Sequence, residues 1–183
     1  MKFPRLLVLI SCFILFDCFQ ARAQDRHEIA GAFGVGSLQA DPGGGTTAVF
    51  GFSYRFHITR HISTEAALDF FKYKFPADPG DNQSTYTDDY QGAQVAIAYY
   101  PLNNRDTGRL LPFLVAGIGK TTTDFTEIPA HPYYRFGAGV QYNPAEKWGF
   151  RVEIRDEIIK SLNINGNPNG NLPSVRLAIV RKF

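Results

Sequence analysis

One short segment of this sequence carries the three side chains of a hydrolytic triad. His61, Ser63 and Glu65 stand two residues apart, and a serine nucleophile needs a histidine base within hydrogen-bond reach and an acid behind it. Neighbours two apart on one face of a strand lie about 7 Å apart, which is too far for such hydrogen bonds. We therefore expect His61 to be a turn-exit histidine beside an inward-facing glutamate, and we expect no enzymatic activity.

The other histidines and acidic residues of the sequence lack the spacing of a metal site. His27, His57 and His131 are far apart in the chain, and we expect them to be solvated histidines of rims and loops. The acidic segment 75–89 does not have the spacing of a calcium-binding loop. The sequence predicts no metal site and no cofactor.

The elements that position the charged residues are predicted to be strands. Apolar and polar residues alternate with a period of two, and turn residues interrupt the pattern at fairly even intervals. Long polar connections such as 39–45 and 75–89 alternate with short ones such as 57–61, although the fourth connection, 101–110, is longer than this rule suggests. Eight strands are expected: Arg26–Leu38, Thr46–Phe56, Ile62–Lys74, Tyr90–Tyr100, Leu111–Thr122, Tyr133–Tyr142, Trp148–Lys160 and Pro173–Phe183.

The face that holds the charges distinguishes a membrane barrel from a soluble one. In Thr46–Phe56, Tyr133–Tyr142, Trp148–Lys160 and Pro173–Phe183, a bulky apolar face is opposed by glycine and charged residues. A lipid-facing band is apolar with aromatic ends, and glycine beside long charged side chains fits a narrow lumen. The prediction is an all-β fold, an eight-stranded antiparallel up-and-down transmembrane β-barrel. A soluble, lipocalin-like periplasmic binding barrel is the less favoured alternative.

The inward face is predicted to carry both signs of charge, so that its side chains neutralise one another. This lumen network is expected to comprise Glu28, Arg55, Glu65, Asp69, Gln94, Arg135, Arg151, Glu153, Arg155 and Arg176. A second set of cations falls near the loop-side ends of strands, where lipopolysaccharide phosphates would accept charge-assisted hydrogen bonds; snorkelling is the alternative reading. These are Lys72, Lys74, Lys120 and Lys160.

The first residues have the pattern of a cleaved export signal. Lys2 and Arg5 precede an apolar run, and Ala21-Arg22-Ala23 fits cleavage before Gln24. We expect residues 1–23 to be a secretory signal peptide and residues 24–183 the barrel domain. Both cysteines leave with the signal, and 16 basic and 16 acidic residues remain. The resulting zero net charge argues against nucleic acid as a partner.

Three segments together resemble the second half of OmpA/OmpX-type small outer-membrane β-barrel domains: 110–119 (LLPFLVAGIG), 135–142 (RFGAGVQY) and 148–156 (WGFRVEIRD). Phe183 resembles the C-terminal signal that the barrel-insertion machinery reads, although Arg181 stands where that signal usually has an apolar residue. The resemblance implies location in the outer membrane, with lipid and lipopolysaccharide as partners. We expect a monomer with a structural, envelope or surface-interaction role. A small passive pore is the alternative.

Overall fold

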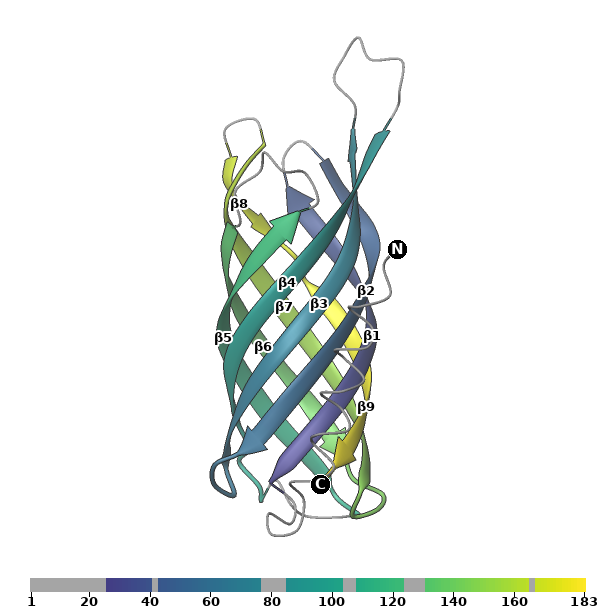
Figure 1. The fold of residues 1–183 in the computed structure, drawn as a ribbon, viewed down its shortest axis with the longest axis vertical. Helices are drawn as coiled ribbons and strands as arrows, with labels where there is room; N and C mark the ends of the chain where they lie inside the picture. Colours follow the sequence, from purple (N-terminus) through teal and green to yellow (C-terminus); the bar gives the residue numbers. More distant parts are fainter. Residues whose placement is uncertain (1–25, 41–42, 77–84, 104–107, 124–130, 165–166) are drawn as a thin grey trace, which may run out of the picture.

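Tilted strands wrap around one axis to form a barrel (Figure 1). The computed structural model describes residues 26–40, 43–76, 85–103, 108–123, 131–164 and 167–183. The predicted cleavage site before Gln24 therefore lies outside the described residues. The strands are β1 His27–Ala40, β2 Gly43–His57, β3 Ile62–Pro76, β4 Thr85–Tyr99, β5 Leu110–Thr123, β6 His131–Tyr142, β7 Trp148–Ile164, β8 Asn167–Asn171 and β9 Ser174–Lys182.

Antiparallel pairing between consecutive strands builds the barrel, and the last strand pairs with the first to close it. β1 pairs with β2 along its whole length and with β9 from Glu28 to Gly36. β8 and β9 occupy the same position in the wall, since both pair with β7 and with β1. The predicted eight-stranded antiparallel barrel is therefore confirmed.

A proline accounts for the division of the last barrel strand into β8 and β9. Pro173 has no backbone N–H to give to the ladder, and it stands between the two elements. Backbone bonds hold the chain in place across the break: the Ser37 N–H donates to the Pro173 carbonyl at 2.9 Å, and the Leu172 N–H donates to Glu157 at 2.9 Å. The barrel wall therefore stays continuous.

The strands reach further toward the loop end than the sequence indicated. The connection expected at 39–45 shrinks to residues 41–42, because β1 continues to Ala40, which is paired with Gly43 of β2. β3 and β4 extend as a paired hairpin above the rest of the rim (Figure 1). The added parts of β1 and β2, residues 39–40 and 43–45, are small or polar and show no apolar alternation, so a hydrophobic pattern does not identify them as strand.

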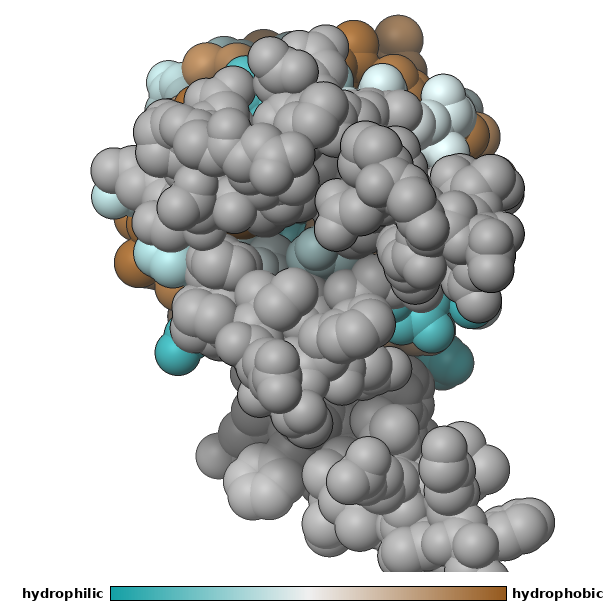
Figure 2. Space-filling view, turned by 90° about the horizontal axis from the view of Figure 1, so that it is seen from above, coloured by the Kyte–Doolittle hydropathy of each residue, from teal (hydrophilic) through white to brown (hydrophobic). Residues whose placement is uncertain are grey.

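Side-chain orientation alternates around the barrel as the sequence predicted. The outward side chains include Phe50, Phe136, Ile154 and Leu177, each more than half exposed. Viewed along the axis from the loop end, apolar side chains appear along the outer edge of the barrel (Figure 2). Among the described residues, no helix is long and apolar enough to cross a membrane.

Candidate functional site

The lumen holds a network of buried ion pairs at inward positions of six strands. Each of its acids and arginines is no more than 5% exposed. The interior of an eight-stranded barrel is just wide enough for side chains to fill, so oppositely charged groups from distant strands meet across it. The members joined by ion pairs are Glu28, Glu65, Asp69, Glu153 and Glu157, with Arg55, Arg135, Arg151, Arg155 and Arg176.

Glu65 is the hub of the part of the network nearer the short turns. Its Oε2 accepts two hydrogen bonds from Arg55, on the neighbouring strand β2. Its Oε1 accepts a 2.7 Å bond from Arg135 Nη1, which reaches across the lumen from β6. Arg151 Nη1 lies 3.5 Å from Oε2. One carboxylate therefore faces three guanidinium groups, and further acids must balance them.

Asp69 is the hub nearer the loops. Its Oδ2 accepts a 2.9 Å hydrogen bond from Arg155 Nη1 and another from Gln94, and its Oδ1 accepts one from Arg176. Glu157 Oε1 accepts a 2.9 Å hydrogen bond from Arg176 Nη2. These contacts join β3, β4, β7 and β9, so that the loop-side half of the lumen is cross-linked through one carboxylate.

Glu153 links the two halves of the network. Its Oε1 accepts from Arg135 Nη2 at 2.6 Å and from Arg155 Nε at 2.9 Å. Arg135 contacts Glu65 and Arg155 contacts Asp69, so a continuous path of charged groups runs along the lumen. With five acids and five arginines, this set neutralises itself, as buried ions require. Lys182 is a further buried cation, and it is registered opposite Glu28.

Apolar side chains close the lumen above the charges. A cluster of buried residues on β2, β3, β4, β6 and β7, together with Leu172, lies at the loop end: Val49, Phe71, Tyr90, Tyr133, Ile159 and Leu172. Phe71 and Tyr90 stack with centroids 5.3 Å apart. The Tyr133 ring lies against the inner face of β5 at Gly119, which has no side chain, and a Cβ there would overlap the ring.

A second cluster of buried apolar residues lines the lumen on β4 and β5, toward the turn end of the barrel. It consists of Ala96, Ala98, Tyr100, Leu111, Phe113 and Val115. The Arg55 guanidinium lies 5.0 Å from the centre of the Phe113 ring, and Arg151 lies 5.7 Å from it. Cation–π contacts strengthen where water is excluded, so this wall holds the same arginines that Glu65 binds.

A Ser–His–Glu arrangement occurs at the turn end, with a different histidine from the one the sequence suggested. His61 is exposed, whereas His57 is 1% exposed. His57 Nδ1 lies 2.5 Å from Ser63 Oγ, and its Nε2 lies 3.0 Å from Glu28 Oε1. The expectation of a solvated His57 was therefore wrong, because β2 continues its inward alternation to His57, which is registered opposite Ser63.

The environment of this arrangement is closed. Ser63 is 0% exposed. Glu28 is also held by Arg151 Nη2 at 2.9 Å and by Gln141 Nε2 at 2.9 Å. A nucleophilic serine must reach its substrate, and Ser63 has no exposed surface with which to do so. The geometry is that of a buried series of polar contacts that ends at Glu28.

The other predicted site residues lie on the outer face or outside the described side chains. Lys72 is exposed and lies 3.2 Å from Asp89, its partner across the β3–β4 ladder. Lys120 is exposed on β5. The side chains of Lys74, Lys160 and His131 lie outside the part that the structure describes. His27 lies near the turn end of β1, where its Nδ1 is 2.6 Å from Tyr54 Oη.

The chain end is organised by Arg181. Its guanidinium lies 5.6 Å from the Trp148 ring centre and 5.1 Å from that of Phe183. The register of β9 runs without a shift from Ser174 to Arg181 against β7. The arginine that departs from the expected apolar pattern is thus accommodated between two aromatic rings at the turn end.

The sequence prediction of the lumen omitted Glu157 and Gln141. Glu157 continues the series Arg151, Glu153, Arg155 at the same spacing of two residues, so the alternation alone could have identified it. Gln141 likewise continues the inward face of β6. Every member of the predicted lumen set lies in the lumen and is buried. Among the described residues, no group of three or more His, Cys, Asp or Glu side chains could hold a metal ion.

A wide apolar exterior around a self-neutralised lumen defines a closed transmembrane β-barrel. The model of the outer membrane protein beta-barrel domain matches residues 8–182, and this chain belongs to that family. It is an outer-membrane protein, in agreement with the resemblance found in the sequence and in disagreement with the soluble lipocalin-like alternative.

Solved structures share the fold at low sequence identity. Neisserial surface protein A has a TM-score of 0.60 and 15% identity, covering 86% of this chain and 97% of that one. OprG of Pseudomonas aeruginosa has a TM-score of 0.61 and 12% identity, covering 87% and 97%. Ail, the attachment invasion locus protein of Yersinia pestis, was solved with the heparin analogue sucrose octasulfate; it has a TM-score of 0.54 and 13% identity, covering 88% and 100%. A search of the curated proteins found no significant match.

Proposed function

We propose that this protein is a closed outer-membrane scaffold with a structural role in the envelope or a role in surface contact, and that it is neither a conduit nor an enzyme. The observation that carries the proposal is the continuous lumen network from Glu28 to Glu157, closed at the loop end by the cluster around Tyr133. A permanent aqueous path would have to displace these mutually paired groups. Breaking buried pairs costs several kcal/mol each, on the order of 3–5 kcal/mol.

The test of the closed lumen is single-channel conductance of the purified barrel in planar bilayers. We expect no stable openings from the wild-type protein. The matched variant combines Asp69→Asn with Arg155→Gln, which removes one lumen charge of each sign and so keeps the lumen network neutral. Stable openings of the wild type that persist in this variant would favour the passive pore and contradict the scaffold.

Contact with lipopolysaccharide is the second part of the proposal. Lys72 and Lys120 are exposed at the loop-side ends of β3 and β5, just beyond outward apolar residues such as Phe70 and Ile118. That position suits a headgroup phosphate, which accepts charge-assisted hydrogen bonds. Surface contact through the loops is also supported by the shared fold with Ail, which binds a polysulfated sugar analogue.

A fourfold variant tests the lysines: Lys72, Lys74, Lys120 and Lys160 each changed to Gln. We expect its barrel to lose stability in lipopolysaccharide and to keep it in neutral detergent. The control is Lys147→Gln, an exposed lysine in the connection between β6 and β7 at the opposite end. Equal stability of the fourfold variant and the wild type in both environments would refute the contact.

The non-enzymatic part of the proposal rests on the burial of Ser63. The hydrolysis that a serine triad in an outer-membrane barrel would be expected to catalyse is deacylation of lipid A. The purified protein should show no lipid A deacylation, and Ser63→Ala should match the wild type in that assay. Deacylation by the wild type that is lost in the variant would overturn this part alone.

A further inference from the structure

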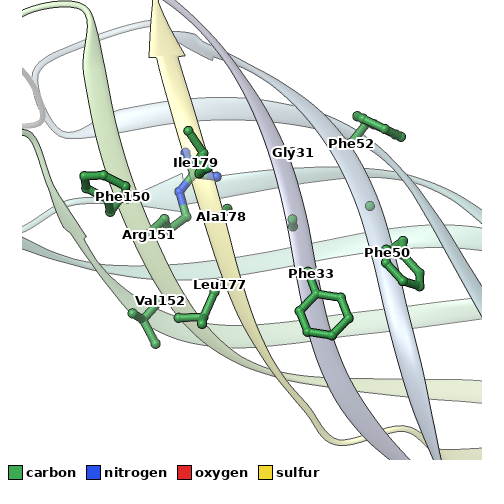
Figure 3. Close-up of a pocket in the computed structure, with 12 residues that line it drawn as sticks. Gly31, Phe33, Phe50, Phe52, Phe150, Arg151, Val152, Leu177, Ala178 and Ile179 are labelled. Carbon is green, nitrogen blue, oxygen red and sulfur yellow. The ribbon is translucent and has the colours of Figure 1, made fainter.

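The outer face carries an apolar groove of about 440 Å³ that crosses four neighbouring strands, β7, β9, β1 and β2. Two rows of outward side chains form its sides (Figure 3). The strand registers place one row along Phe50, Phe33, Leu177 and Val152 and the other along Phe52, Gly31, Ile179 and Phe150. The backbone between the rows forms the floor, where Ala32 and Ala178 turn their side chains away from the outer face.

Gly31 interrupts the second row. Its partners across the ladder, Phe52 and Ile179, are bulky and exposed. The missing side chain of Gly31 therefore leaves a gap between these two residues. The next outward residues on β1 are Ile29 and Phe33, about 14 Å apart along the strand. Once the bulk of those side chains is subtracted, the gap is narrower than a helix, whose diameter is about 10 Å or more.

The glycine is not explained by the needs of the barrel itself. A Cβ on Gly31 would have only Phe52 Cε1 near it, at 4.0 Å, whereas a Cβ on the inward-facing Gly139 would lie 2.6 Å from the Phe113 ring. The pairing of β1 passes Gly31 without a bulge on either side. Glycine inside a strand often marks a bulge, a bend or a close approach by a ligand or another backbone, and the first is excluded here.

We propose that this groove is a binding site for one acyl chain of a membrane lipid, which lies across β1 at Gly31. The groove lies on the apolar outer face, which an outer-membrane barrel turns toward the hydrocarbon of the bilayer. Its sides are aromatic and aliphatic, and the one charged residue along it, Arg151, directs its guanidinium to Glu28 in the lumen. Polar ligands therefore find no partner in the groove.

The shape favours a slender chain over a second barrel. Phe33 and Phe50 pack against each other with centroids 5.2 Å apart, which makes one wall continuous. Another copy of this chain presents a convex surface that would rest on the two rows and leave the gap at Gly31 empty. A flexible hydrocarbon chain enters the gap and contacts the floor and both sides.

The experiment is NMR of the full barrel in nanodiscs of dimyristoylphosphatidylcholine, with protonated lipid chains and selectively methyl-labelled protein. It compares cross-peaks from lipid methylenes to the methyls of Leu177 and Ile179 with those to Leu114 and Ile118. The latter pair lies on the outward face of β5, on the opposite side of the barrel. We expect several-fold stronger cross-peaks at the groove.

Two variants decide the assignment. Gly31→Leu fills the gap and should reduce the groove cross-peaks to the level of β5, while Ala116→Leu, an outward substitution on β5, should leave them unchanged. Should Gly31→Leu fail to fold, Phe33→Ala removes the other wall and should have the same effect. Equal cross-peaks at both faces of the wild type, or groove cross-peaks that survive Gly31→Leu, would overturn the proposal. Contacts between differently labelled barrels at Leu177 would overturn it in favour of a second copy.

Discussion

The inner and outer faces of this barrel come from the same strands, but they depend on their neighbours to very different degrees. Arg155 faces inward and contacts Asp69, Glu153 and Glu157, each on a defined atom. Ile154, the residue before it, faces outward and is 65% exposed. Away from the groove at Gly31, the outer face needs only apolar character, since lipid adapts to it. The inner face needs specific partners. Substitutions on the two faces should therefore change the free energy of unfolding by different amounts and for different reasons.

The largest effect is expected from Glu65→Ala. Arg55, Arg135 and Arg151 would then face one another without their shared carboxylate. Leaving buried charges unpaired costs about 3–5 kcal/mol of the free energy of unfolding. Urea unfolding in phosphatidylcholine vesicles, followed by the fluorescence of the single tryptophan, Trp148, measures it. A loss no greater than that of the exposed Glu146→Ala would contradict the role of Glu65 as hub.

The effect of an outward substitution on the free energy of unfolding should depend on the depth of the residue in the membrane and not on contacts with particular side chains. Leu114 lies between Leu110 and Ile118 on the apolar face of β5. Leu114→Arg is expected to lower the free energy of unfolding by about 2–4 kcal/mol, and Leu110→Arg, near the turn end, by about 0–1 kcal/mol. The same urea titration compares them. Equal losses would mean that the lipid-facing band is placed wrongly.

Glycines on the two faces should respond in opposite ways to alanine. Gly119→Ala drives a Cβ into the Tyr133 ring and should cost about 1–3 kcal/mol, as overpacking does. Gly31→Ala places its Cβ in ordinary contact with Phe52 at 4.0 Å and should stabilise the strand by about 0.5–1 kcal/mol, since alanine loses less chain entropy on folding. Thermal unfolding of the two variants in one detergent tests the contrast, which fails if both changes have the same sign.

The smallest effect is expected at Lys72. Its ion pair with Asp89 is exposed, at 74% and 50% for the two side chains, and exposed pairs contribute about 0–1 kcal/mol. Lys72→Gln should therefore change the free energy of unfolding in neutral detergent by less than about 1 kcal/mol, with a difference that shrinks in high salt. A larger change would mean that outer ion pairs hold the barrel as inner ones do.

The period-two pattern predicted the strands and their faces because one face of each strand meets lipid and the other a narrow lumen. Strand ends were harder to predict. Toward the loop ends of β1 and β2 the residues become small or polar, so the apolar signal disappears while backbone pairing continues, as between Ala40 and Gly43. The division of the last strand at Pro173 was also missed. A pattern of apolar and polar residues does not show that a proline lacks the N–H group that strand pairing uses.

The members of the lumen were predictable one by one, but their partners were not. Alternation turns Glu65 inward, yet only the stagger of the strands brings it to Arg135, 70 residues away in the chain. The same holds for His57, Ser63 and Glu28, which come from three strands. Within one segment, the histidine nearest to Ser63 in the sequence is His61. The true partner, His57, lies on the neighbouring strand, and the register between two strands cannot be inferred from a single segment.

The distribution of partners along the chain has a consequence for assembly. Arg55 and Glu65 sit on adjacent strands and can pair in a lone hairpin, whereas Arg176 reaches Asp69 from the last strand, and Arg151 reaches Glu28 on the first. An unzipped seam between β1 and β9 would separate Arg151 from Glu28 and weaken the contact between Arg176 and Asp69, and the loss of a charge partner in a low-dielectric interior is costly. Charge pairing therefore penalises any partly closed intermediate, and insertion and closure should proceed as one cooperative event.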